Sequence, residues 1–167
     1  HPGRSGASHD HDFFGATTTD AHSSGASLVV ADTTCADPAD TAAYWVPTLL
    51  DDGDPVDPIR AVAYYRPGPG VAAPDVHSWP LGLAMLAGDP GAVGPQPMGI
   101  VAWHCGTSER LRAEPPTCAE RAPLALRLTF PDCWNGRDLD SEDHRSHVAY
   151  SLDGTCPATH TTPIVQL

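Results

Sequence analysis

One stretch of the chain decides its fold class: Leu124-Ala125-Leu126-Arg127-Leu128-Thr129-Phe130. Large apolar side chains alternate there with smaller or polar ones, and this period of two is typical of a half-buried β-strand. Six more short runs between turn-forming residues also predict strands, over residues 27–31, 44–50, 61–65, 83–87, 99–104 and 147–150. The sequence therefore predicts a mostly β fold, a loop-rich antiparallel β-sandwich or jelly roll with short helical turns.

Composition restricts the classes of function. The 167 residues predict one domain, residues 1–167, and 15 glycines with 18 prolines leave few places for long helices. A net charge of -12 argues against nucleic acid and anionic membranes as partners. No apolar run approaches the roughly 20 residues that span a bilayer. The chain contains no lysine, so Schiff-base chemistry on a lysine is excluded.

The five cysteines predict disulfide bonds of an exported protein, because no Cys-x-x-Cys pair indicates a zinc site. We expect Cys105 to pair with Cys118 and Cys133 with Cys156. Cys35 is then left over, and its partner is expected outside these residues or on another chain. The loop-like start at His1 also suggests a removed signal peptide or a missing upstream segment, so the expected location is extracellular.

Two stretches, residues 8–12 and 138–147, hold most of the candidate chemistry. His9 and His11 are two residues apart, so an extended segment points both to the same side. His144 and His147 are three apart, which predicts one face of a helical turn. If the fold brings the stretches together, four imidazoles share one pocket with carboxylates behind them.

A metal centre is one interpretation of these stretches. Imidazole nitrogens suit zinc or copper, and the candidate ligands are His9, His11, His144 and His147. Asp140 or Asp143 would supply an oxygen ligand or orient an imidazole. The alternative is that these histidines hydrogen-bond neighbouring carboxylates and only hold loops together.

Acid–base catalysis on a glycan is the second interpretation. Paired carboxylates and a histidine beside an aspartate are the groups that such chemistry uses, which makes Asp140, Asp143, His144 and His11 the candidate catalytic residues. Arg4 and Arg145 flank the two stretches and could hold an acidic sugar, or could merely neutralise neighbouring aspartates. Trp134 could stack on a sugar ring, or could belong to the core.

An ordered set of motifs resembles the domain-of-unknown-function family nineteen-ninety-six over nearly the whole chain. The motifs are His9-Asp10-His11-Asp12-Phe13-Phe14-Gly15, Tyr44-Trp45-Val46-Pro47, Tyr64-Tyr65-Arg66, Gly82-Leu83-Ala84-Met85-Leu86-Ala87-Gly88-Asp89, Phe130-Pro131-Asp132-Cys133-Trp134-Asn135-Gly136 and Leu139-Asp140-Ser141-Glu142-Asp143-His144-Arg145-Ser146-His147. Ala16, Asn135 and Val148 depart from the family pattern, and the change at Asn135 removes a carboxylate there.

The resemblance implies a secreted protein of the kind found in actinobacteria and filamentous fungi. Such proteins often accompany carbohydrate-binding modules, which suggests work on polysaccharide by association. We therefore expect a secreted carbohydrate-active protein, a glycoside hydrolase or polysaccharide lyase that acts through the His/Asp residues on a glycan. The alternatives are a non-catalytic glycan-binding or structural surface module and a metal-binding extracellular protein, and the sequence leaves the oligomeric state open.

Overall fold

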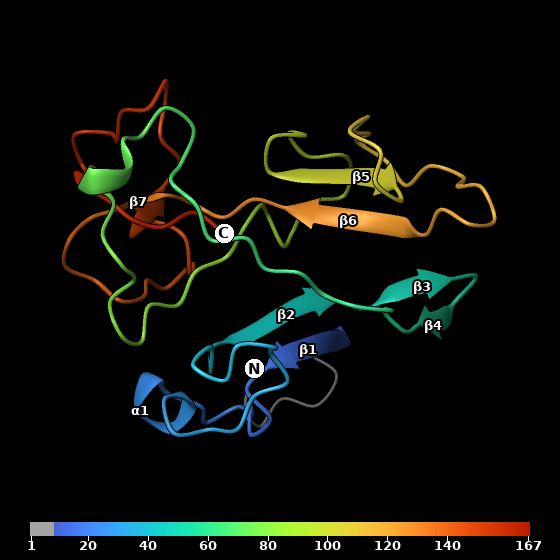
Figure 1. Ribbon diagram of the computed structural model, residues 1–167, viewed down its shortest axis with the longest axis horizontal. Coiled ribbons are helices and arrows are strands. Elements are labelled where there is room, and N and C mark those ends of the chain that lie inside the picture. The colour runs from blue at the N-terminus through green and yellow to red at the C-terminus, as the bar shows by residue number, and fades with distance from the viewer. Residues whose placement is uncertain (1–8) are drawn as a thin grey trace. The chain divides into compact units, whose positions relative to one another are not determined.

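A computed structural model of the chain describes residues 9–167. The described chain is mostly β and rich in loops, and its strands pair antiparallel in four small sheets (Figure 1). It divides into two compact units, an N-terminal unit that ends at Val62 and a C-terminal unit, Ala63–Leu167. The predicted class, mostly β and loop-rich, is confirmed; the single domain stays a prediction.

The N-terminal unit contains two antiparallel ribbons. Strand β1 (His11–Gly15) pairs with β2 (Ala43–Pro47), so that Phe13 lies opposite Trp45. Strands β3 (Leu49–Asp51) and β4 (Asp54–Val56) form a hairpin. Its two-residue turn, 52–53, has φ values of 50° and 94°, and two positive φ angles are what a tight hairpin turn requires.

The strand predicted over residues 27–31 is wrong. One helical turn, α1 (Gly25–Leu28), occupies this region, and it begins after Ser24. The Ser24 hydroxyl accepts from the Ser27 N–H at 3.3 Å, while the Ser27 hydroxyl accepts from the Ser24 N–H at 2.8 Å. This reciprocal capping box stabilises a helix start, and no neighbouring strand competes for the backbone there.

The C-terminal unit contains a short 3₁₀ turn, η1 (Ala73–Asp75), and two sheets. Strand β5 (Val101–Cys105) pairs with β6 (Leu124–Leu128). The second sheet has the order β8-β7-β9, where β7 is Cys133–Trp134, β8 is Val148–Ala149 and β9 is Thr162–Pro163. The strands predicted at 99–104, 124–130 and 147–150 are confirmed with shifted ends.

Residues 61–65 and 83–87 form no strand, so these two predictions are wrong. In the second segment the Ala84 N–H donates to the Leu139 carbonyl at 2.9 Å and the Leu86 N–H donates to the His144 carbonyl at 3.0 Å. The segment that accepts these two hydrogen bonds is a turn-rich loop rather than an extended strand. The backbone hydrogen bonds of residues 83–87 therefore do not continue into a β-ladder.

The core of the C-terminal unit lies around β7. Cys133 is fully buried and forms a disulfide with Cys156, and a second disulfide joins Cys105 to Cys118. Both predicted pairings are confirmed, and Cys35 is the free cysteine of the described residues. Disulfides of this kind are typical of an oxidising environment. Within residues 9–167 no helix is both long and apolar enough to cross a membrane.

Candidate functional site

The loop that carries the second histidine pair is organised around Asp143. One oxygen of this carboxylate accepts the backbone N–H groups of Arg145 and Ser146, at 3.1 and 2.8 Å. The same oxygen accepts the hydroxyls of Ser141 and Ser146, each at 2.8 Å. These bonds hold the pKa of Asp143 far below its ordinary value, with the backbone bonds contributing most. A carboxylate that stays ionised is suited to positioning the loop rather than to donating a proton.

We expect Asp143→Asn to lower the free energy of unfolding at neutral pH. Because the folded-state pKa of Asp143 is depressed, its stabilising effect is fully present above the ordinary pKa of 3.8 and is lost as the pH falls toward the folded value. Denaturant unfolding at several pH values should therefore show the variant and the wild type converging below about pH 4. The matched control is Glu142→Gln, since that exposed neighbour is not hydrogen-bonded within the described residues. Parallel pH profiles for wild type and Asp143→Asn would contradict the assignment.

Asp140 and His144 form a dyad at the surface of this loop. His144 Nδ1 lies 2.7 Å from Asp140 Oδ1, and the two side chains are 56% and 46% exposed. The carboxylate accepts a hydrogen bond from the Nδ1–H, which leaves Nε2 as the nitrogen that can accept or donate a proton. Both residues are predicted catalytic residues, and their pairing supplies the orientation that such a role needs.

The backbone of His144 is strained. Its φ angle is +54°, in the left-handed region that non-glycine residues rarely occupy. The position is held by two backbone bonds, one from the His144 N–H to the Ser141 carbonyl and one from the Leu86 N–H to the His144 carbonyl. Strain of this kind is concentrated at functional sites when the surroundings maintain it.

His147 occupies a different environment. Its Nδ1 lies 2.8 Å from Ser141 Oγ, and its side chain is 1% exposed. Ser141 has one hydroxyl proton, which goes to the ionised Asp143, so His147 Nδ1 must donate to the Ser141 oxygen. His147 Nε2 is then a buried atom that makes no hydrogen bond within the described residues.

The prediction that His144 and His147 share one face of a helical turn is wrong. The left-handed φ of His144 breaks any helical geometry at that residue. As a result, His144 points to solvent and is mostly exposed, whereas His147 is buried beside β8.

Trp134 is tied to its own loop. Its indole N–H donates to the Asp138 carbonyl at 2.6 Å, and the residue is half-buried. Arg137 binds the Asp138 carboxylate with its Nε and Nη2 atoms at 3.0 and 2.8 Å. Hydrogen bonds from Arg137 and Asn135 lower the pKa of Asp138. These contacts favour a loop-bracing role for this group over sugar stacking by Trp134.

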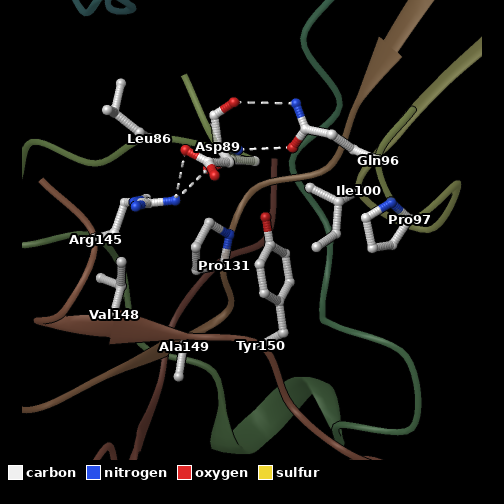
Figure 2. Close-up of a pocket in the computed structure, with 11 residues that line it drawn as sticks. Leu86, Asp89, Gln96, Pro97, Ile100, Pro131, Arg145, Val148, Ala149 and Tyr150 are labelled. Atoms are coloured by element: carbon white, nitrogen blue, oxygen red, sulfur yellow. Dashed lines mark hydrogen bonds and ion pairs between the residues drawn. The ribbon is translucent and has the colours of Figure 1, made fainter. Parts of the chain in front are cut away.

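Arg145 lies at the edge of a cavity of about 290 Å³. Its Nη1 atom donates to the Gly88 carbonyl at 3.2 Å and lies 3.5 Å from an oxygen of Asp89. Figure 2 shows Arg145 and Gln96 approaching Asp89 from opposite sides. The contact with Asp89 agrees with the alternative in which the arginine neutralises a neighbouring carboxylate.

The cavity wall is mostly apolar. Its apolar residues are Leu86, Pro97, Ile100, Pro131, Val148 and Ala149. Tyr150 adds a phenol whose hydroxyl donates to the Thr129 carbonyl at 2.8 Å, and burial raises its pKa to about 12. Asp89, Gln96 and Tyr150 were not among the predicted site residues, because no local spacing relates them to the histidine stretches.

The first histidine pair belongs to the N-terminal unit. The rings of His9 and His11 lie on one side of the segment that enters β1, with centroids 4.5 Å apart, as the alternation predicted. His144 and His147 belong to the C-terminal unit. Arg4, proposed to bind substrate, lies outside the described residues.

Within the part of the chain that the structure describes, no group of three or more His, Cys, Asp or Glu side chains is arranged to hold a metal ion. The dyad geometry still resembles the way a carboxylate orients a metal-bound imidazole. Zinc or copper bound through the histidines stays a prediction.

Comparison with known proteins gives one match. A family model described as "Domain of unknown function (DUF1996)" matches residues 1–167, the whole chain. No curated protein and no solved structure matches the chain.

Proposed function

The chain belongs to the DUF1996 family of domains of unknown function, and we propose that it is a secreted carbohydrate-active protein, a hydrolase or lyase of polysaccharide or cell-wall glycan. The observation that carries the proposal is the 2.7 Å contact between His144 Nδ1 and Asp140 Oδ1. The oxidising environment that the two disulfides indicate supports the extracellular part.

His144 is the proposed general acid–base. With Nδ1 engaged by Asp140, its Nε2 can take a proton from a sugar or deliver one to a leaving oxygen. Asp140 is a positioning residue that selects the tautomer and holds the ring. Asp143 has an indirect role, because its hydrogen bonds hold the loop on which both residues lie.

Arg145 is the proposed substrate-binding cation. It follows His144 directly in the chain, and its guanidinium retains unused donors because its contact with Asp89 is a single one at 3.5 Å. A sugar carboxylate could therefore bind there beside the apolar cavity wall. His11 stays a candidate on the N-terminal unit, and metal binding by the predicted ligands His9, His11, His144 and His147 stays the alternative chemistry.

Activity against a panel of neutral and acidic polysaccharides tests the proposal, with reducing ends and unsaturated products both measured. His144→Ala is expected to lower kcat by about 100-fold or more, since general acid–base catalysis contributes that much. Asp140→Asn is expected to lower kcat less and to shift the pH profile, a change that a purely structural role would not cause. The matched control is His22→Ala, an exposed histidine of the N-terminal unit, which should leave the rate unchanged.

Three outcomes would change this assignment. Full activity in His144→Ala would remove the site. Activity abolished by a chelator and restored by zinc or copper would favour the metal alternative. A panel on which the wild type processes nothing would leave a non-catalytic, glycan-binding or structural module as the better description.

A further inference from the structure

Four rings form a continuous row on one face of the β1–β2 ribbon. His9, His11 and Phe13 occupy alternate positions along one segment, and Trp45 lies opposite Phe13 on β2. The centroids are separated by 4.5 Å, 6.3 Å and 6.4 Å in that order. We call these four residues the ring row.

The ring row is a surface and not a core. Phe13 is 56% exposed and Trp45 is 39% exposed, and the His9 side chain is also exposed. On the other face of the ribbon, Phe14 and Tyr44 are half-buried. Exposed aromatic side chains gathered in one patch mark a binding surface, because water otherwise meets a large apolar area.

Charge decides which partner fits this surface. Residues 9–62 contain ten aspartates and one arginine, Arg60, so they carry most of the net negative charge of the chain. Asp10 and Asp12 alternate with the rings along the same segment, so their side chains lie on the other face of the ribbon and add to the negative field at the ring row only at longer range. A field of this sign attracts cations and repels polyanions such as uronate polymers.

We propose that the ring row binds a cationic glycan, an amino-sugar polymer whose amines are free and protonated. The C–H faces of successive pyranose rings would stack on Phe13, Trp45 and the imidazoles. The ammonium groups would lie over aromatic faces, where cation–π attraction adds to the attraction of the negatively charged unit. This is a binding activity of the N-terminal unit, and it stands whether or not His144 is catalytic.

Titration calorimetry of the full chain with glucosamine oligosaccharides tests the inference, under conditions that protonate the sugar amines. Phe13→Ala and Trp45→Ala are each expected to weaken binding about tenfold. The matched control is Tyr64→Ala, which removes a ring that is 71% exposed in the C-terminal unit and should leave the Kd unchanged. Trp45→Phe should retain most of the affinity, which separates loss of the ring from loss of folding.

A second variant in the same experiment tests how much negative charge contributes to binding. Asp10→Asn with Asp12→Asn should weaken binding at low salt, and the difference should shrink at high salt. His144→Ala should bind like the wild type, so failure of the catalytic proposal and failure of this one can be told apart.

Three results would overturn the inference. The first is equal affinity for fully N-acetylated oligomers, which carry no charge. The second is an oligolysine of equal charge that binds as tightly through the same residues, which would make the site a basic-peptide site. The third is a Trp45→Ala variant that binds like Tyr64→Ala.

Discussion

Replacing Cys133 and Cys156 together by alanine is expected to lower the free energy of unfolding by about 3 kcal/mol through the loss of loop closure alone. The disulfide spans a sequence separation of 23 residues and therefore restricts the unfolded chain strongly. Cys133 is also fully buried in the central strand of its sheet, so its replacement removes packing contacts as well. The total loss should exceed the loop-closure contribution.

Denaturant unfolding of the full chain measures this effect, and the chain offers its own control. Cys105→Ala with Cys118→Ala opens a loop with a separation of 13, but both sulfur-bearing residues are only half-buried. That double variant should lose less stability than the first. Equal losses for the two variants would show that burial around Cys133 contributes nothing to the difference.

Gly68→Ala is expected to destabilise the C-terminal unit by about 3 kcal/mol. A Cβ atom at Gly68 would overlap the carboxylate of Asp132. That carboxylate is buried and accepts the Ser151 N–H at 2.7 Å and the Ser151 hydroxyl at 2.6 Å. It cannot move aside without breaking these bonds, so the added methyl group either clashes with it or leaves buried polar groups unsatisfied.

Gly94→Ala is the matched control for this substitution. A Cβ at Gly94 would have no atom within 4 Å, and the residue is exposed. We expect a change within about 1 kcal/mol, toward higher stability if the alanine restricts the unfolded chain. Thermal or denaturant unfolding compares the two variants directly. If Gly68→Ala were as stable as Gly94→Ala, Asp132 could not be held as rigidly as its contacts indicate.

Features that depend on near neighbours could be predicted from the sequence. The alternation in residues 124–130 predicts β6, and the cysteine spacing predicts both disulfides. At Asn135-Gly136 the glycine has a φ of +75°, a conformation for which glycine is the preferred residue. Among the local predictions that failed, the strand at residues 27–31 was wrong because side-chain hydrogen bonds between Ser24 and Ser27 outweighed the apolar run that follows them.

The candidate site could be predicted only in part. Asp140 and His144 are four residues apart, so their contact needs no other segment of the chain. The partners of Arg145 come from residues 88 and 89, and no spacing in the sequence relates them to it. Tyr150 lines the same cavity, and only the burial of its ring distinguishes it from other tyrosines.

By itself, the sequence determined the β class, the disulfide pairs and which residue types meet in the 138–147 loop. The β class and the loop contacts follow from backbone preferences and from contacts a few residues apart. The disulfide pairs, which join residues 13 and 23 apart, follow from the number and spacing of the cysteines. Only the tertiary structure decided which histidine is exposed for chemistry. His144 and His147 are equivalent by spacing, but closure of the loop against residues 84–86 and the β7 core exposes the first and buries the second. Burial depends on segments far apart in the chain, and local patterns do not record it.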